Sequence, residues 1–409
     1  MFKKISAVLL IATLLSIGSL GFAAGDTFAA TYYCDNDRAA SMYPYCDNTY
    51  DGAWEKLLGY SGDANRDSRL TKGNSGAQYF WRFWNIQSGE YNLNVWLANY
   101  RFTNTCAEYA ANTDAIHSCF DQNSAAWGWN SIWNKFITYG SPLVEVNAFN
   151  APSSSSGTGA DLVRIIQAST LSTTQEKAYH SNPEVASIQK KMLNAIDNYK
   201  DIQGSFRIKF ANINQDERVD FMVSEDHAPG SYVKITPKNG TVKEHKSNGK
   251  TLIQLNHETK TLRKQTLAPV QKVQGPRHFT NQHGEPVYVH RQDPADAHAA
   301  SKVTFPQNYA FWLKNPENKV VGHEKLLQRN VTVIEGKHDA YMSKKLGAVT
   351  YKMWVDTKTG VLLKLSGKDA NGKEVYSIHV TDIKFDQGVD KTKFSTAEPL
   401  GWKNLSQNK

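Results

Sequence analysis

The pattern that most restricts the fold of this chain is an alternation of apolar and polar residues through short segments. It is clearest in 91–98, whose odd-numbered residues are Tyr, Leu, Val and Leu and would share one face of a strand. The segment 77–85 precedes it as a second strand, after which the chain makes a Ser-Gly turn. Strands and tight turns continue to Ile165 with almost no helical spacing, which is typical of a β-sandwich.

The first thirty residues have the composition of an export signal. Two lysines precede the apolar run 5–22, and small residues of the kind found before a signal-peptidase site follow it. The most apolar stretch, 7–20, is short for a bilayer span, and no lipobox precedes Cys34. We expect 1–30 to be removed, which leaves a secreted, extracytoplasmic chain without a membrane span. A retained membrane anchor is the alternative.

The four cysteines form two close pairs. Oxidising surroundings after export favour local disulfides. A hairpin folded around 112–113 would set Cys106 opposite Cys119, within reach of a bridge. Zinc ligation is the alternative, but neither pair has the short spacing of a zinc knuckle. We predict two uncrossed disulfides, Cys34–Cys46 and Cys106–Cys119, and no metal.

Composition and charge both change near a Ser/Thr-rich stretch. Residues 31–167 hold nine Lys or Arg against thirteen Asp or Glu, a net charge of −4, whereas 168–409 hold 36 against 25, a net charge of +11. We therefore expect two domains, 31–167 and 183–400, joined by a linker at 168–182. Opposite net charges predict a modest, salt-sensitive interface between them.

The basic C-terminal half of an exported protein points to anionic partners. An anionic wall polymer or lipid headgroups fit that charge outside the cytoplasm, and no nucleic acid is expected there. A surface that is merely well solvated is the alternative. Four histidines, His278, His283, His290 and His298, lie in a polar stretch without tight metal spacing, and we expect them in a solvated loop.

Helical spacing is clear once, from Val185 to Tyr199, with Asn182 as an N-cap and Pro183 in the first turn. Strand patterns separated by Asn-Gly and Asp-to-Gly turns follow it. They cover 204–210, 218–224, 232–236 and 251–255, and near the end of the chain 348–355, 360–366 and 373–382.

Five motifs in order carry a resemblance in the N-terminal half. They are Asp47-Asn-Thr, Gly89-Glu-Tyr-Asn-Leu-Asn-Val-Trp-Leu, Arg101-Phe-Thr-Asn-Thr, Ala125-Ala-Trp-Gly-Trp-Asn-Ser-Ile and Gly159-Ala-Asp-Leu-Val-Arg-Ile. Together they resemble the golvesin C-terminal-like domain, which is also found beside xanthan lyase-type enzymes. The resemblance implies a β-sandwich over 31–167. The cysteine pair at 106 and 119 departs from it.

Three motifs carry a second resemblance. They are Tyr199-Lys-Asp-Ile-Gln-Gly-Ser-Phe-Arg-Ile after the helix, Trp354-Val-Asp-Thr-Lys-Thr-Gly-Val-Leu-Leu-Lys, and Ile383-Lys-Phe-Asp386 running on to Phe394. This half resembles the lipoprotein carrier superfamily, which includes LolA, LolB and the RseB/MucB regulators. The resemblance implies a mainly β fold with some α, an incomplete β-barrel wrapped around a helix and enclosing an apolar cavity for acyl chains. It covers 183–265 and 330–395 and leaves 269–329 as an unassigned insertion.

Two sets of residues are candidates for binding. Alternating strand residues would face the apolar cavity that the resemblance implies. The alternation by itself is more typical of an ordinary hydrophobic core, so the cavity contact depends on the resemblance. These strand residues are Phe206, Ile208, Phe210, Phe221, Val223, Met353 and Val355. In the Trp-rich N-terminal half, Trp127 and Trp129 flank a glycine and would suit stacking on sugar rings if their faces are exposed.

The sequence holds no motif of a catalytic centre. It has no G-x-S-x-G elbow, no H-E-x-x-H and no P-loop, so we predict no enzyme, no catalytic residues and no cofactor. The acidic segment 63–67 has the spacing of a calcium loop but lacks the glycine and glutamate that follow in one. The leading hypothesis is a secreted envelope protein that binds a lipid-like or lipoprotein-like ligand, or senses envelope state through an envelope protein. The alternative is a polysaccharide-binding or adhesion protein acting through the sandwich.

Overall fold

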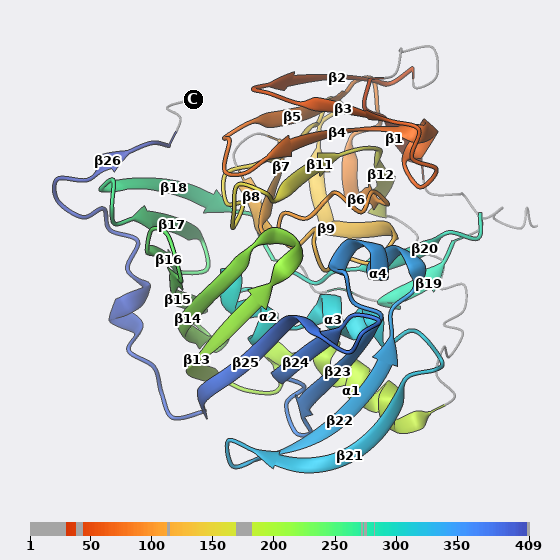
Figure 1. The fold of residues 1–409 in the computed structure, drawn as a ribbon. Helices are drawn as coiled ribbons and strands as arrows, with labels where there is room; N and C mark the ends of the chain where they lie inside the picture. Colours follow the sequence, from red (N-terminus) through yellow and green to blue (C-terminus); the bar gives the residue numbers. More distant parts are fainter. Residues whose placement is uncertain are drawn as a thin grey trace, which may run out of the picture.

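The computed structural model describes residues 30–37, 44–112, 115–168, 182–270, 273, 276–281 and 283–406. The fold is mainly β with a few short helices, as predicted: an N-terminal sandwich and a C-terminal sheet curled on helices (Figure 1). The signal region up to residue 29 and the linker region 169–181 lie outside the described residues, so both remain predictions. Within the described residues, no helix has the length and apolarity needed to cross a membrane.

The N-terminal half consists of two facing sheets and a short third one. The first has the order β1-β12-β6-β9 and the second β2-β5-β10-β7-β8, while the third pairs β11, β4 and β3. The strands are β1 (Thr31–Cys34), β2 (Cys46–Asp51), β3 (Glu55–Leu58), β4 (Asp67–Lys72), β5 (Gln78–Phe83), β6 (Gly89–Leu97), β7 (Ala107–Ala111), β8 (Ala115–Phe120), β9 (Gly128–Thr138), β10 (Leu143–Asn147), β11 (Gly157–Ala160) and β12 (Val163–Gln167).

The sandwich core lies between β6 of one sheet and β5 and β10 of the other. The alternating face of β6 that the sequence predicts packs there, against Tyr79, Trp81 and Val144 among others. The opposite face of β6 is buried as well, because Trp96 packs on Trp129 and on Val287 from the C-terminal half. Both faces of β6 are therefore buried, whereas the alternation predicts one apolar face.

The C-terminal half is one antiparallel sheet ordered β18-β17-β16-β15-β14-β13-β25-β24-β23-β22-β21. Its strands include every segment that the sequence predicts there. They are β13 (Asp201–Phe210), β14 (Gln215–Ser224), β15 (Gly230–Pro237), β16 (Lys243–Ser247), β17 (Thr251–Asn256), β18 (Thr261–Leu267), β21 (Lys319–Leu326), β22 (Arg329–Lys337), β23 (Thr350–Asp356), β24 (Leu362–Lys368) and β25 (Glu374–Phe385). The short β26 (Lys403–Asn404) adds to β18.

Helices fill one face of this sheet, here called the inner face. Helix α1 (Pro183–Leu193) begins as predicted: the Asn182 side chain accepts from the N–H groups of Glu184 and Val185, and Pro183 occupies the first turn. Its apolar stripe, including Ile188 and Met192, joins the core cluster of the sheet. Helices α2 (Ser301–Thr304) and α3 (Gln307–Trp312) enter the same cluster, and α4 (Ala340–Leu346) lies toward the sandwich (Figure 1).

The unassigned insertion 269–329 joins the halves. Its strands β19 (His278–Thr280) and β20 (Pro286–Val289) extend the first sandwich sheet, with β20 parallel to β9. Its helices α2 and α3 then turn into the core of the C-terminal half. The insertion thus contributes to the packing of both halves and is part of the folded body.

The interface between the halves is larger than the modest, salt-sensitive one that the charges predict. Strand β8 pairs with β18 and β9 with β20, so backbone hydrogen bonds cross the boundary. The sandwich loop 121–126 enters the C-terminal half: Ser124 O accepts from the Trp312 indole at 3.0 Å, and Ala126 joins the C-terminal core. Net charge did not predict this, because the contact is built from ladders and buried polar groups.

Both disulfides form as predicted, Cys34–Cys46 and Cys106–Cys119. The second pair lies at the base of the β7–β8 hairpin, whose register sets Ala111 opposite Ala115. The Cα atoms are 5.7 Å apart in the first pair and 3.8 Å apart in the second. The two bridges differ in surroundings: the first is part of the sandwich core, and the second lies at the boundary between the halves.

Candidate functional site

The seven residues predicted to face a ligand all point into the C-terminal core. Each is 3% exposed or less, and each belongs to the cluster that includes α1 and α3. Phe206 and Phe221 lie side by side with ring centroids 6.0 Å apart, and Phe210 stacks on Tyr376 at 5.1 Å. The strands therefore bring the seven residues onto one inner face, where helices cover them. Their role as ligand contacts stays a prediction.

Helix α3 is the main cover of that face. Its Tyr309, Phe311 and Trp312 are buried, and Trp312 packs against His338 and Tyr351. The helix is also fixed by polar contacts, since Tyr351 donates its hydroxyl to Trp312 O at 3.0 Å. A helix satisfies its own backbone hydrogen bonds, so this cover is held by side chains and not by a strand ladder.

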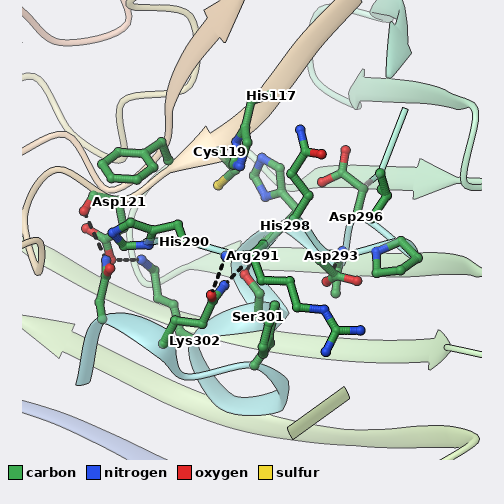
Figure 2. A pocket seen from close by; sticks show the side chains of 18 of the residues that line it. His117, Cys119, Asp121, His290, Arg291, Asp293, Asp296, His298, Ser301 and Lys302 are labelled. Carbon is green, nitrogen blue, oxygen red and sulfur yellow. Dashed lines mark hydrogen bonds and ion pairs between the residues drawn. The ribbon is translucent and has the colours of Figure 1, made fainter. Parts of the chain in front are cut away.

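A cavity of about 110 Å³ lies where the insertion meets the sandwich (Figure 2). Its walls come from β8 and the following loop, from the segment 290–298, and from α2 and the start of α3. His117, Cys119 and Asp121 enter from the sandwich, and His298 and Lys302 face them from the insertion (Figure 2). None of the residues predicted to bind a ligand lines this cavity.

The charged groups of the cavity are paired. Lys302 forms a buried ion pair with Asp121 and also donates to Thr105 O at 3.4 Å. Arg291 pairs with Asp197 through Nη2 at 2.7 Å. Burial raises the pKa of Asp293, and burial together with the neighbouring Asp293 raises the pKa of Glu225 well above its usual range. In both cases burial, which penalises the charged carboxylate, is the largest cause.

Two buried histidines line the cavity, contrary to the solvated loop that we expected for them. His290 and His298 are both 5% exposed, because the polar stretch that carries them runs into the boundary between the halves. The His290 ring packs between Phe120 and Phe311, and its Nε2 lies 3.0 Å from Asn130 Oδ1. Burial lowers the pKa of both imidazoles well below the usual range, so both are neutral near pH 7.

His298 lies against a disulfide. Its Nε2 is 3.0 Å from Cys106 Sγ, and its ring meets that of His245 edge to face with centroids 3.5 Å apart. His298 has φ of +49° and Cys119 has φ of +59°, a left-handed conformation that side chains of this kind adopt infrequently. Cys106, Cys119 and His298 place their Sγ and ring nitrogen atoms within 4.8 Å of one another. Sequence spacing could not find this group, because His298 follows the cysteines at a great distance along the chain.

The two tryptophans of the alternative hypothesis differ in exposure. Trp129 is 2% exposed: its indole donates to Glu285 Oε2 at 2.8 Å, and the Arg164 guanidinium lies 4.0 Å from its ring centroid. Trp127 is half-buried and packs edge to face on Trp96. Trp129 therefore offers no free ring face to a sugar in this structure. Trp127 keeps part of its surface.

The two carboxylates of the acidic segment 63–67, Asp63 and Asp67, are buried in the sandwich. Asp63 accepts hydrogen bonds from Ser68 Oγ at 2.8 Å and Asn99 Nδ2 at 2.7 Å. Burial raises its pKa to about 6, and the nearby Asp67 acts in the same direction. Among the described residues, Asp63 belongs to no group of three side chains that could hold a metal ion. The group that does converge is Cys106, Cys119 and His298.

Comparisons with known proteins are sparse. No protein-family model and no curated protein matches the chain, so the golvesin-like resemblance stays a prediction. Solved structures that match include an uncharacterized conserved protein from Thermus thermophilus, at 8% identity and TM-score 0.30 over 53% of this chain and 98% of that one. They also include MucB with MucA from Pseudomonas aeruginosa (15%, TM-score 0.28, 52% and 61%) and lipoprotein LppX of Mycobacterium tuberculosis (12%, TM-score 0.28, 51% and 99%).

Two of these three, MucB and lipoprotein LppX, carry names of the kind that the C-terminal motifs resemble. Each match covers about half of this chain, and the chain spans 61% of the MucB structure. Likeness at these TM-scores says nothing about what this chain binds. Its ligand has to be argued from its own residues.

Proposed function

We propose that this chain is an extracytoplasmic, non-enzymatic binding protein whose C-terminal half takes a hydrophobic, lipid-like ligand. One observation supports this: the inner face of the sheet is a continuous apolar surface covered by helices. Phe206, Phe221 and Met353 lie on three strands of this surface, under α1 and α3. An acyl chain that replaced the side chains of α3 would restore the same apolar contacts and would leave every strand ladder intact.

Displacing α3 exchanges nine hydrogen bonds between this helix and the rest of the chain for hydrogen bonds with water. Three involve Trp312, two involve the Asn308 side chain, three involve the Gln307 side chain, and one joins Gln189 to Ala310 O. Each contributes on the order of 1 kcal/mol net. Burial of an acyl chain contributes about 0.8 kcal/mol for each methylene, so a long chain offsets that cost. The apolar surface of an envelope protein is the other occupant that fits the same face.

Trp312 allows a direct test. We expect a fluorescent fatty acid to bind the full mature chain saturably, with energy transfer from tryptophan to the probe. Trp312→Phe should lose part of the transfer while it retains binding, because α3, which the ligand displaces, stays next to the proposed site and the other nine tryptophans remain as donors. Trp402→Phe, which removes a tryptophan that packs outside this core, is the matched control and should leave the transfer unchanged.

Two outcomes would contradict the proposal. One is the absence of saturable uptake by protein whose near-ultraviolet circular dichroism shows it to be folded. The other is uptake with transfer unchanged in Trp312→Phe, which would place the probe elsewhere on the protein.

A further inference from the structure

The two disulfides of this chain have different chemical neighbours, and this contrast extends beyond the proposed ligand site. Cys34 and Cys46 belong to the sandwich core, and the contact near them is a backbone oxygen, Asp47 O, at 3.4 Å from Cys34 Sγ. Cys106 Sγ lies 3.0 Å from the buried Nε2 of His298, and Cys119 lines a cavity. Among the described residues, the second bridge is the one that lies beside a third side chain able to ligate a metal.

From this geometry we infer that Cys106, Cys119 and His298 form a redox-gated site for zinc or a similar borderline-soft divalent cation. In the oxidised chain the two sulfurs are joined, and His298 contacts Cys106. In the reduced chain two thiolates and one neutral imidazole surround a single point, which is a donor set that zinc prefers. The ligand atoms already lie within 4.8 Å of one another, which is the span of a single coordination sphere.

The charge balance suits a buried position. Two thiolates compensate the two charges of the cation, and the imidazole adds none, so no net charge is left inside the protein. The nearby Lys302 is neutralised by Asp121 and requires no further partner. The fourth tetrahedral position faces the cavity that Cys119 lines, where a water molecule completes the coordination.

His298 is held in place for this role. It lies at the start of a short helical turn, where Ser301 Oγ donates to His298 O at 2.5 Å. Its Nδ1 is buried and has no hydrogen-bond partner among the described residues, and His245 stacks against the ring edge to face. The contact that positions Nε2 is the one with Cys106 Sγ at 3.0 Å.

The redox step requires a dithiol reductant from outside the chain. One of its thiolates attacks Cys119 Sγ, the sulfur that lines the cavity, and the electron pair of the broken S–S bond passes to Cys106 Sγ. The second thiolate of the reductant then attacks the mixed disulfide and releases Cys119. Two electrons and two protons reach the protein, and the reductant leaves as a disulfide. Zinc binding then releases both thiol protons to water.

The site would connect the two halves. Both cysteines belong to the sandwich, and His298 belongs to the insertion that fills the C-terminal core. A cation held by all three is an added cross-link between the halves, whereas in the oxidised chain these three residues are linked across the boundary by the contact of His298 with Cys106. Reduction in the presence of zinc should therefore raise the stability of the interface, and reduction with chelator should lower it.

Zinc alone is the probe that tests the inference. The full mature chain is reduced with a phosphine, freed of reductant and titrated with zinc against a chromophoric chelator. We expect one tightly bound zinc per reduced chain and none per oxidised chain. Cobalt in place of zinc should give the intense visible absorption of a tetrahedral thiolate complex. His298→Gln should weaken zinc binding roughly tenfold or more, since a ligand is lost.

The second disulfide provides the matched control. The variant Cys34→Ser/Cys46→Ser should bind zinc on reduction as the parent does, and Cys106→Ser/Cys119→Ser should not bind it. The His298→Gln chain keeps both disulfides, so its fold can be verified before reduction. Zinc binding unchanged by His298→Gln, or retained in Cys106→Ser/Cys119→Ser, would overturn the inference. So would a reduced chain that remains folded and binds no zinc.

Discussion

The two hydrophobic cores of this molecule are closed in different ways. The sandwich core lies between two sheets that the segment 31–167 supplies almost by itself. The C-terminal core has a sheet on one side only, and its other side is covered by α1, by the helices of the insertion and by Ala126 from the sandwich loop. Both cores are filled by side-chain packing, but each wall of the sandwich is itself joined by backbone ladders, whereas no ladder joins the covering helices of the C-terminal core to one another. The C-terminal core therefore depends on the sandwich for part of its cover.

The largest effect should come from removing the cover. Trp312→Ala should cost about 3–5 kcal/mol, the usual range for a buried aromatic, and should loosen the C-terminal core while the sandwich stays folded. Trp81→Ala in the sandwich core is the matched control and should destabilise both halves, because the loop 121–126 would lose its support. Amide hydrogen exchange followed strand by strand measures the difference. Equal loss of protection in both halves of Trp312→Ala would contradict the comparison.

The next effect concerns the ion pair that ties α2 to the sandwich loop. Asp121→Ala leaves the Lys302 ammonium buried without its carboxylate and should cost about 3 kcal/mol. The double variant Asp121→Ala/Lys302→Met removes both charges and should recover most of that loss. Urea unfolding of the three chains measures the coupling. If the double variant is no more stable than the single one, the pair is not what holds the interface.

Two buried groups, Asp63 in the sandwich and His338 in the C-terminal half, should respond to acid in opposite directions. In the sandwich, burial raises the pKa of Asp63 to about 6, so the folded state keeps a proton that the unfolded state loses near pH 3.8. The stability from this group is present below pH 3.8 and is lost as pH rises toward 6, about 2 kcal/mol after screening by solvent. Asp63→Asn should abolish that slope, as unfolding measured at pH 4, 5 and 7 would show.

In the C-terminal core the sign is reversed. Burial lowers the pKa of His338 to about 3. As pH falls, the unfolded state therefore binds a proton on this imidazole near pH 6.5, whereas the folded state binds it only near pH 3. Stability from this group is present above pH 6.5 and is lost as pH falls toward 3, by about 2 kcal/mol at pH 5. Protection of β22 and β23 should therefore fall between pH 7 and 5 while that of β4 to β6 rises. A parallel change in both halves would count against the comparison.

The smallest effect should come from the solvent side of the C-terminal sheet. Lys352 and Glu335 form a cross-strand pair at 3.1 Å with both side chains about a third or more exposed. Lys352→Ala should change stability by less than about 1 kcal/mol, since exposed pairs contribute little. Thermal unfolding checks this. A larger loss would mean that the outer face also helps to close the core.

Local sequence patterns predicted where the strands and the first helix lie better than they predicted which strands pair. Two-residue alternation located β5 and β6, and the Asn182 cap with Pro183 located the start of α1. Nothing local predicts that β13 pairs with β25 or β9 with β20, because those partners are distant in the chain. The helices of the insertion were missed because each is too short to show a helical period, and both are buried.

The candidate sites show the same difference between features that are local in sequence and features that depend on tertiary contacts. Alternation showed that Phe206, Phe221 and Met353 are buried, but it could not separate a core from a cavity, since both demand apolar side chains. Cysteine spacing predicted both disulfides, because each closes a short local loop. The approach of His298 to Cys106 depends on how the insertion docks on the sandwich. Only tertiary structure could reveal it.

The pairing of β13 with β25 also decides the order of events as the chain emerges. If it is exported from its N-terminus, as its first residues predict, the sandwich strands arrive together and early. Strand β13 can pair with β14 at once but must wait for β25, the last long strand, on its other edge. Until then an unpaired edge and an apolar face are open to solvent, a state prone to aggregation. The early part of that interval, after β14 arrives and before the insertion covers it, is when a ligand could reach the inner face without displacing α3.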